Sequence, residues 1–384
     1  MKLKRLPEDF IVEELIDLPL DGGPFAVYRL QKQSLGTLEA MRAVEKAWNL
    51  APHQLAYAGL KDKHAHTTQY FTVCNGPAAS LKQPAVQVRH VGQASRALKS
   101  SDLRGNRFAI VLRDFAPEQL PQLETAIAAA QSTGVPNYFD DQRFGSLGPT
   151  REFIAHPWCL GNYERVIWLA VAEENSHDRP RDAQQKELIR KRWGEWAALA
   201  PRLDRTWRRD IVAYLAEHPG DFRRATALLR KDLRSLYVAA FQSHLWNLTL
   251  KAELTARLGE KQRLTAAGAA GGLLFPRSGI ELNLPPALPL LSARLKNPPP
   301  ELAESIAAAL APFNMQLREL RIKYPDDTFF SKGERSSLLR LKDFTHEFAA
   351  DELHSGQKKL TLRFELGSGS YATMLVKWLG AAIR

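Results

Sequence analysis

Strand-like patterns mark both ends of this chain and leave most of its middle without them. Short segments rich in β-branched and aromatic residues, separated by turn residues, occupy the first third. They are Phe10–Leu15, Phe25–Leu30, Tyr70–Cys74, Val86–Val91 and Phe108–Leu112. The same alternation returns at Lys359–Leu366, close to the other end of the chain. A strand-rich frame that is interrupted by a different middle region fits this distribution best.

Apolar residues at helical spacing accompany the early strands. The clearest set follows Thr37, which suits a helix N-cap. Its members are Leu38, Met41, Val44 and Trp48. A second helix is expected over 120–133. The DGGP turn at Asp21–Pro24 predicts that Phe10–Leu15 and Phe25–Leu30 form a hairpin.

The middle of the chain is basic and has a helical character. Residues 181–234 contain 14 Lys or Arg and 8 Asp or Glu. The tryptophans of this stretch are Trp193, Trp196 and Trp207. Residues 266–300 are rich in Gly, Ala and Pro, which favours loops or irregular strands. Another helix is expected around 301–323.

Length and charge narrow the class of protein. With 384 residues, the chain has room for two domains or for one domain with a large insertion. Its formal net charge of +11 favours a polyanionic partner, nucleic acid before membrane. The two cysteines, Cys74 and Cys159, are too few for a disulfide framework or a Cys-rich zinc site. This cysteine usage fits a reducing compartment.

The sequence lacks membrane and targeting signals. No run of about 18 apolar residues occurs, and the N-terminus is charged from Lys2 onward, unlike a signal peptide. We therefore expect a cytoplasmic protein with no membrane span. The common motifs of nucleotide-cofactor enzymes, P-loop proteins, zincins and serine hydrolases are absent as well.

The densest polar segment is Tyr57–Gln69. It places one carboxylate, Asp62, between two lysines, and these cations favour the ionised form of the side chain. Such a carboxylate can act as a nucleophile or a base without a metal. The alternative is an exposed aspartate in a charged turn. The neighbouring His64 and His66 lack further ligands at matching spacing, so we expect turn residues there and no metal site.

This segment resembles the signature of the TruD family of tRNA pseudouridine synthases, a Gly-x-Lys-Asp stretch followed by Ala, Thr and Gln. The matching positions are Gly59, Lys61, Asp62, Ala65, Thr67 and Gln69. Five further segments resemble blocks of the same family and occur in the family's order. They are Pro7–Glu14, Arg104–Phe108, Val135–Gly145, Leu236–Asn247 and Gly369–Thr373.

The resemblance implies an α+β fold. A pseudouridine-synthase sheet, mixed and largely antiparallel with helices, would be formed by residues 1–133 and 341–384. A mostly helical TRUD insertion domain would span 134–340. The implied reaction cuts uracil from ribose C1′ and rejoins it through C5, so no cofactor is required. Bacterial members modify uridine 13 in the D arm of tRNA, so tRNA is the implied partner; we expect a monomer without an obligatory protein partner.

The resemblance also assigns residues to the site. Asp62 is the implied catalytic residue, and the sequence leaves open whether it adds to C1′ or promotes a glycal. The implied substrate-binding residues are Phe10, Asn106, Phe108, Tyr371 and, as a cation near Asp62, Lys4. The target base must leave its stack, and aromatic rings would replace the lost stacking. Judged by burial preference alone, Phe10 and Phe108 are more often ordinary core residues.

Two other functional classes stay open. A non-catalytic RNA-binding or RNA-chaperone protein of the same fold is disfavoured by the intact Asp62 motif. A zinc-dependent base-modifying enzyme is disfavoured by the missing Cys and His ligand sets. In the pseudouridine-synthase interpretation, the basic middle belongs to the TRUD insertion and holds RNA through phosphates and stacking, with Arg208 and Arg209 beside Trp207 as first candidates. The alternative is a set of solvated helix faces around a local tryptophan core.

Overall fold

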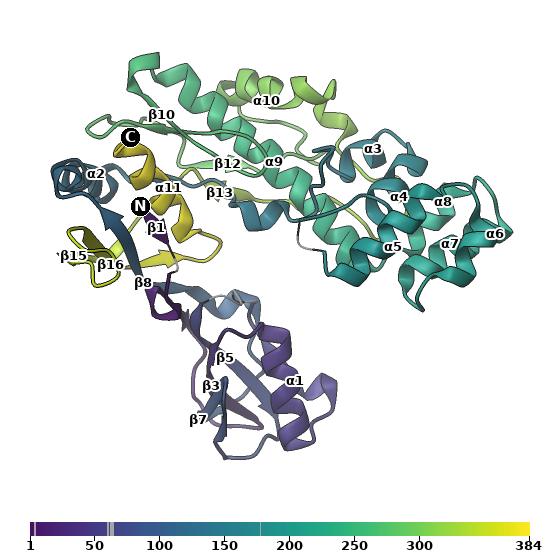
Figure 1. Ribbon diagram of the computed structural model, residues 1–384, viewed down its shortest axis with the longest axis horizontal. Helices are drawn as coiled ribbons and strands as arrows, with labels where there is room; N and C mark the ends of the chain where they lie inside the picture. Colours follow the sequence, from purple (N-terminus) through teal and green to yellow (C-terminus); the bar gives the residue numbers. More distant parts are fainter. Residues whose placement is uncertain (4, 60, 62–64, 177) are drawn as a thin grey trace. The chain divides into compact units, whose positions relative to one another are not determined.

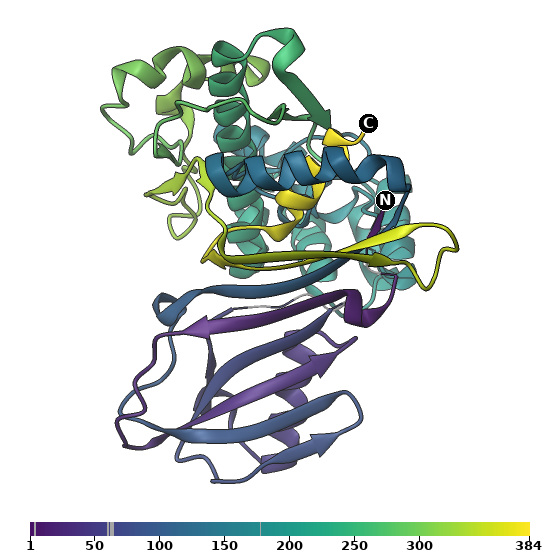
Figure 2. The same cartoon turned by 90° about the vertical axis from the view of Figure 1, so that its left-hand side faces the viewer.

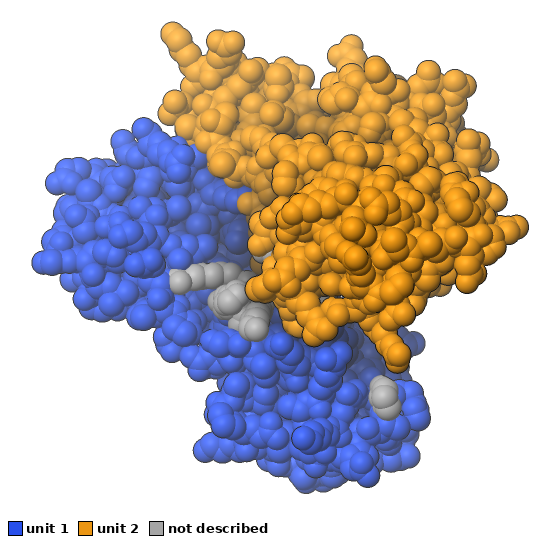
Figure 3. Space-filling view, turned by 45° about the vertical axis from the view of Figure 1, so that its right-hand side comes forward, with its two compact units in different colours: residues 1–135, 339–384 blue, residues 136–338 orange. Residues whose placement is uncertain are grey.

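The chain folds into two compact units, which Figure 3 shows in different colours. Unit 1 consists of Met1–Val135 and Leu339–Arg384, and unit 2 consists of Pro136–Leu338. The computed structural model describes residues 1–3, 5–59, 61, 65–176 and 178–384. Unit 1 is therefore assembled from both ends of the chain, whereas unit 2 is one continuous segment.

One mixed sheet forms the framework of unit 1. Its strands are β1 (Lys2–Leu3), β2 (Phe10–Ile16), β3 (Phe25–Gln33), β4 (Leu55–Tyr57), β5 (His66–Cys74), β6 (Leu81–Gln83), β7 (Val86–Ala94), β8 (Leu103–Phe115), β15 (Lys342–Ala350) and β16 (Lys358–Gly367). The order is β15-β16-β8-β2-β5-β3-β7-β6, with β1 beside β8 and β4 beside β5. Among the described residues all pairs are antiparallel except β2 with β5. The predicted α+β class with a largely antiparallel sheet is confirmed.

Helices cover this sheet in two places. They are α1 (Thr37–Trp48), α2 (Leu120–Thr133) and α11 (Ala372–Ala382). Helix α1 packs its buried Met41 and Val44 against Tyr28 and Leu30 of β3. Helices α2 and α11 lie over the β8–β16 part of the sheet (Figures 1 and 2). The middle strands β2 and β5 thus lie between two covered regions.

The start of α1 differs from the sequence-based prediction by one residue. Thr37 is the first helical residue and is buried, whereas Leu38, expected on the apolar face, is 50% exposed. The N-terminal capping bond comes from Glu39, whose Oε2 accepts from the Gly36 N–H at 3.0 Å. The Thr37 hydroxyl is therefore available for contacts outside the helix.

The predicted hairpin of β2 and β3 does not form. Strand β5 lies between them, and β3 pairs with β5 and β7. The DGGP turn is fixed against the end of β7, because the carboxylate of Asp21 accepts from the Ser95 N–H at 2.8 Å and the Gly22 N–H donates to Gln93 O at 3.1 Å. These remote contacts, which the local pattern does not contain, direct the connection away from β2.

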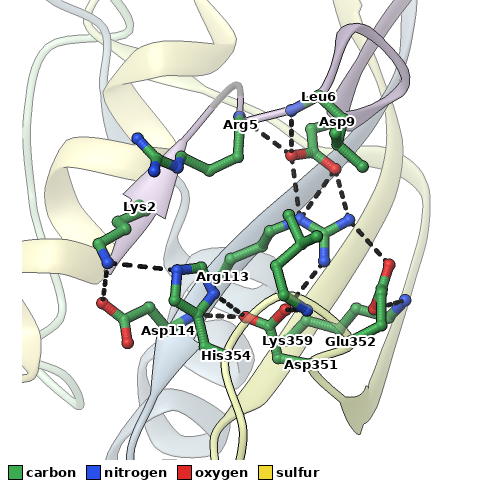
Figure 4. A network of polar contacts seen from close by, with 11 residues as sticks. Lys2, Arg5, Leu6, Asp9, Arg113, Asp114, Asp351, Glu352, His354 and Lys359 are labelled. Atoms are coloured by element: carbon green, nitrogen blue, oxygen red, sulfur yellow. Dashed lines mark hydrogen bonds and ion pairs between the residues drawn. The ribbon is translucent and has the colours of Figure 1, made fainter.

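A buried arginine on β8 joins both ends of the chain (Figure 4). Arg113 is 3% exposed and donates through Nη2 to Asp9 Oδ1 at 2.8 Å. Through Nη1 it donates to Asp351 Oδ1 at 3.0 Å, and through Nη2 to Glu352 Oε1 at 3.0 Å. The segment before β2, the central strand β8 and the β15–β16 turn therefore meet at one guanidinium.

Close approach of two strands explains the glycine of the Arg104–Phe108 segment. Gly105 of β8 pairs with Gly367 of β16. A Cβ atom at Gly105 would lie 2.1 Å from the carbonyl oxygen of Leu366, well inside contact distance. Only glycine at position 105 lets β16 come this close to β8. The next residue of β8 is Asn106, one of the predicted substrate-binding residues.

Unit 2 is mainly helical, as predicted for the middle of the chain. Its helices are α3 (Ala155–Cys159), α4 (Tyr163–Val171), α5 (Pro180–Lys191), α6 (Trp196–Leu199), α7 (Trp207–Glu217), α8 (Phe222–Ala225), α9 (Lys231–Arg257) and α10 (Ala303–Leu310). Its short strands are β10 (Arg263–Ala266), β11 (Leu273–Pro276), β12 (Ala287–Pro289) and β13 (Glu334–Ser336). Two more, β9 (Val135–Pro136) and β14 (Leu338–Leu339), stand where the chain passes between the units. Across the described residues, no helix combines the length and the apolar character that a membrane crossing needs.

Two predictions for unit 2 need correction or refinement. The helix expected around 301–323 ends at Leu310, because Pro312 lacks an N–H and Asn314 adopts a left-handed φ of 51°. The tryptophans belong to the hydrophobic core of the unit: Trp196 is 6% exposed, and Trp193 and Trp207 pack against that core. For these three residues, the local-core alternative is the better description.

Candidate active site

Three of the predicted substrate-binding residues share one face of two neighbouring strands. In the register of β2 and β8, Val12 is opposite Phe108 and Glu14 is opposite Asn106. Phe10 lies two residues before Val12 on the same strand. Because side chains alternate between the faces of a sheet, Phe10, Asn106 and Phe108 point to the same side. The structure thus brings together three residues that are far apart in the sequence.

The aromatic members of this face form a continuous row. Phe10 and Phe108 meet edge to face with ring centroids 6.4 Å apart. Phe108 stacks on Phe364 of β16, with centroids 5.4 Å apart. Phe10 and Phe108 are each 6% exposed, and Phe364 is 1% exposed. Sequence reasoning missed Phe364, although the alternation of Lys359–Leu366 placed it on the inward face.

A buried ion pair lies beside this row. Lys61 Nζ is 2.9 Å from Glu14 Oε1, and the side chains are 9% and 0% exposed. The second oxygen, Oε2, accepts from the Tyr70 N–H at 2.8 Å, where β2 and β5 stop pairing. Glu14 was not predicted as a site residue. The sequence did contain a sign of its role: Glu14 continues the alternation of Phe10 and Val12, so a carboxylate occupies a position that faces the interior.

Besides Glu14 Oε1, whose contact is the ion pair with Lys61, three buried polar atoms on the same face have no hydrogen-bond partner in the described part of the chain. They are Thr67 Oγ1, Gln69 Nε2 and Asn106 Oδ1. Thr67 and Gln69 belong to β5, where Thr67 is opposite Val12 of β2. A buried polar group without a partner costs about 1 to 3 kcal/mol, so such groups gather where a function requires them. This cluster marks the middle of the sheet as the candidate site.

Several predicted positions fall outside the described residues. These are Asp62, the implied catalytic residue; Lys4, the implied nearby cation; and His64 of the histidine pair. His66 is the first residue of β5. Within 1–3, 5–59, 61, 65–176 and 178–384, no cluster of three or more His, Cys, Asp or Glu side chains could hold a metal ion.

Tyr371 stands at the end of the sheet where Asn106 lies. Strand β16 ends at Gly367, which is opposite Gly105, and Tyr371 directly precedes α11. Its carbonyl oxygen accepts from the Met374 N–H at 3.1 Å. Tyr371 is partly exposed, in contrast to the buried Phe10 and Phe108. The structure therefore brings Tyr371 to the same edge of the sheet as Asn106.

A cavity of about 440 Å³ opens at this edge of the sheet. Its lining residues are Leu15, Arg104, Gly105, Lys342, Asp343, Glu365, Leu366 and Gly367. Arg107, which is 55% exposed at its side chain, donates to Glu365 at 2.7 Å, and this hydrogen bond raises the pKa of the guanidinium. Arg104 is 58% exposed and lies 3.8 Å from the same carboxylate. Exposed cations at the rim of a cavity suit a phosphate-bearing partner.

Comparison with known protein families decides which family this is. The sequence model of the family described as tRNA pseudouridine synthase D (TruD) matches residues 1–266. The chain belongs to this family.

Individual TruD proteins match over nearly the whole chain. A protein of Methanocaldococcus jannaschii named "Probable tRNA pseudouridine synthase D 2" is 32% identical, covering 98% of this chain and 91% of that protein. The tRNA pseudouridine synthase D of Leptospira interrogans is 27% identical, covering 98% and 95%. A crystal structure described as TruD from Methanosarcina mazei has a TM-score of 0.73 at 22% identity and covers 98% and 93% of the two chains. The last match supports the fold.

In this TruD protein, side chains of unit 2 hold the Val135–Gly145 segment in place through hydrogen bonds. Arg335 donates through Nη2 to Asn137 Oδ1 at 2.6 Å and through Nε to Asn137 O at 2.9 Å. Its guanidinium lies 4.1 Å from the ring centroid of Phe139. Asn247 of α9 exchanges two bonds with the Phe139 backbone, at 2.8 and 2.9 Å. Arg335 and Asn247 therefore fix this segment from two directions.

The basic stretch 181–234 of the TruD chain carries fewer available cations than its composition suggests. Arg208 is a correction: its side chain is 13% exposed, and its Nη1 lies 2.7 Å from Asp182 Oδ1. It also lies over the Trp207 ring, 4.7 Å from the centroid. Among the described residues, those of this stretch with neither a carboxylate partner nor an aromatic contact are Arg202, Arg205 and Arg209. Arg202 and Arg205 are exposed, so they replace Arg208 as candidates for phosphate contacts.

Proposed function

We propose that this protein is a tRNA pseudouridine synthase that isomerises uridine 13 in the D arm of tRNA. Asp62 is the catalytic carboxylate, and the reaction uses no cofactor. The N1–C1′ bond breaks, uracil turns, and C5 bonds to C1′; C5 then loses its proton and N1 gains one. Substrate and product are isomers, so no oxidant or energy source enters. Asp62 either adds to C1′ or takes the 2′-proton.

The observation that carries this proposal is the cluster of polar groups on the face of the sheet that bears Phe10, Asn106 and Phe108. Lys61, which directly precedes Asp62 in the sequence, is buried and paired with Glu14 at 2.9 Å. The same face carries the Phe10–Phe108–Phe364 row and Asn106 Oδ1, which accepts no hydrogen bond from any residue that the structure describes. A turn that served only as a solvated connection would not need a buried ion pair.

The residues of the face have distinct tasks in the proposed reaction. Removing a base from its stack costs a few kcal/mol, and the rings of Phe10, Phe108 and Tyr371 compensate for part of that loss. Asn106 offers an amide to the base or to the backbone of the catalytic segment. Lys4 stays the proposed cation near Asp62.

Unit 2 has a different proposed task. It lies within the TRUD insertion expected over residues 134–340, and it holds tRNA through phosphates and shape. Exposed arginines such as Arg202 and Arg205 suit such contacts, because a guanidinium matches the geometry of a phosphate. The protein acts as a monomer and needs no protein partner.

Release of tritium tests the proposal directly. Purified protein is incubated with tRNA transcript that carries tritium at uracil C5, with and without a chelator. A second transcript has cytidine in place of uridine 13. We expect release of about one tritium per transcript, equal with chelator, and none from the second transcript. Tritium release from the transcript with cytidine 13 would show that the enzyme modifies a different uridine. Loss of release in the presence of chelator would contradict a metal-free reaction. No release from the first transcript would leave only RNA binding.

A further inference from the structure

The polar groups of Lys61 contact three structural elements. Its Nζ pairs with Glu14 of β2 at 2.9 Å. Its N–H donates to the Thr37 hydroxyl at the start of α1 at 2.8 Å. Its carbonyl oxygen is 3.5 Å from Thr37 Oγ1 and also 3.5 Å from Lys32 Nζ of β3, which donates more closely to Leu35 O at 2.7 Å. Lys61 is therefore fixed from three directions.

A relay to β5 orients the Thr37 hydroxyl. Thr37 Oγ1 donates to Gln69 Oε1 at 2.9 Å. A hydroxyl has one proton and two lone pairs, so this bond leaves a lone pair for the Lys61 N–H. Thr37 is 3% exposed and Gln69 is 0% exposed. Both side chains are therefore shielded from bulk water.

The segment around Lys61 is surrounded by more buried polar and charged side chains than a simple turn needs. Glu14 and Lys32 are each 1% exposed. Burying charged side chains is expensive, and well-packed apolar residues are often at least as stable. Glu14 and Thr37 contact Lys61 directly, Lys32 lies at 3.5 Å from its carbonyl oxygen, and Gln69 acts through Thr37. Polar side chains from four elements around one residue indicate that the position of this backbone matters more than its stability.

We propose that Glu14, Lys32, Thr37 and Gln69, together the Lys61 seat, are positioning residues for the carboxylate at position 62. The inference rests on the proposed function, in which Asp62 reacts. Consecutive Cα atoms are about 3.8 Å apart, so holding the N–H and the ammonium group of Lys61 restricts where the next side chain can reach. A misplacement of about 1 Å can reduce a rate about a hundredfold.

Thr37 offers the cleanest test, because two substitutions separate its hydroxyl from its shape. Thr37→Val keeps the shape and removes the hydroxyl, whereas Thr37→Ser keeps the hydroxyl. We expect Thr37→Val to lower kcat at least about tenfold with little change in KM for tRNA, since binding is not affected. Thr37→Ser should stay within about threefold of wild type.

Thr72 provides the matched control. It is 0% exposed on β5, and its Oγ1 accepts from the Leu98 N–H at 3.0 Å, away from the Lys61 seat. Thr72→Val should lower the melting temperature about as much as Thr37→Val and leave kcat unchanged. Glu14→Gln, which keeps an acceptor for Tyr70, is a second variant in case Thr37→Val does not fold. It should show the same loss of kcat at constant KM.

The outcomes separate the two proposals. An active wild type with Thr37→Val or Glu14→Gln at normal kcat would overturn the seat and leave the function intact. An equal loss of kcat in Thr72→Val would also overturn it, because the effect would then be general destabilisation. A wild type that forms no pseudouridine would overturn both. Loss in Thr37→Val, recovery in Thr37→Ser and normal kcat in Thr72→Val would establish the seat.

Discussion

Arg113 and Asp351 lie 3.0 Å apart in the interior of unit 1, although 238 positions separate them in the chain. The same guanidinium binds Asp9 near the N-terminus. A sheet built from two distant segments needs contacts that join them, because the chain itself does not hold the second segment in place. Arg113 supplies such a contact on β8, the strand that also carries Asn106 and Phe108 of the candidate site.

Removing Arg113 should therefore destabilise unit 1 strongly. In Arg113→Leu, the buried carboxylates Asp9 and Asp351 lose their shared cation, and breaking a buried pair in this way costs about 3 to 5 kcal/mol. Lys2→Met is the control within the same network, since Lys2 is 43% exposed and lies 3.1 Å from Asp114. An exposed pair contributes about 0.2 to 1 kcal/mol. Urea unfolding of both variants checks this difference, and equal losses would contradict it.

The same network makes stability depend on acid pH. Burial raises the pKa of Asp351, but hydrogen bonds from backbone N–H groups, from His354 and from Arg113 hold that pKa well below its usual 3.8. The Arg113 hydrogen bond also lowers the pKa of Glu352 to about 2. A carboxyl whose pKa is lower in the folded state adds stability above its unfolded pKa and loses it as the pH falls towards the folded value.

We expect the urea midpoint of the wild type to decrease from about pH 5 to about pH 3. Asp351→Asn cannot titrate at this position, so its midpoint should decrease less over the same interval, from a lower starting value. Parallel curves for the two proteins would show that Asp351 does not contribute to the acid dependence.

The aromatic row permits a test that separates stacking on the substrate from packing in the core. Phe108→Leu and Tyr371→Leu should each reduce the single-turnover rate by an amount that matches stacking of about 1 to 3 kcal/mol per base. Phe115→Leu is the control, because Phe115 is 0% exposed on the same strand β8 and lies at its far end. It should lower the melting temperature and keep the rate. If Phe108→Leu behaves like Phe115→Leu, Phe108 is a core residue.

Exposed arginines of unit 2 should set the salt dependence of tRNA binding. Removing a phosphate contact reduces the slope of log affinity against log salt by about one unit. We expect this for Arg202→Ala and Arg205→Ala, with little change in kcat. Arg181→Ala is the control, since Arg181 is 80% exposed but already pairs with Asp204. The check is to measure the tRNA affinity of all four proteins at several salt concentrations. A changed slope for Arg181→Ala, with unchanged slopes for Arg202→Ala and Arg205→Ala, would contradict the proposal.

Much of the sheet could be predicted because its inner strands alternate clearly. Phe108, Ile110 and Leu112 were predicted on one face, and their exposed fractions are 6%, 0% and 0%. The edge strand β15 was not predicted, since its residues are mostly exposed and carry little apolar alternation. The pairing of β2 was mispredicted because its partners, β5 and β8, come later in the sequence than β3, and local patterns do not specify such pairing.

The sequence predicted only the part of the site that lies within one continuous segment. Tyr57–Gln69 attracts attention through its own composition, but the Lys61 seat comes from β2, β3, α1 and β5 and forms no motif. A weaker signal existed: Tyr28, Leu30 and Lys32 continue one inward alternation on β3, and a lysine at such a position needs partners. Which partners it finds depends on the strand order, which local patterns do not specify.

The central claim is that the carboxylate at position 62 isomerises uridine. Single-turnover tritium release by Asp62→Asn, at saturating protein, tests it most directly, with Asp17→Asn as a control because Asp17 is an exposed carboxylate of the same unit. We predict no measurable release by Asp62→Asn, tRNA affinity close to wild type, and a normal rate for Asp17→Asn. Release by Asp62→Asn within about tenfold of wild type, a barrier change of only about 1.4 kcal/mol, would contradict the claim.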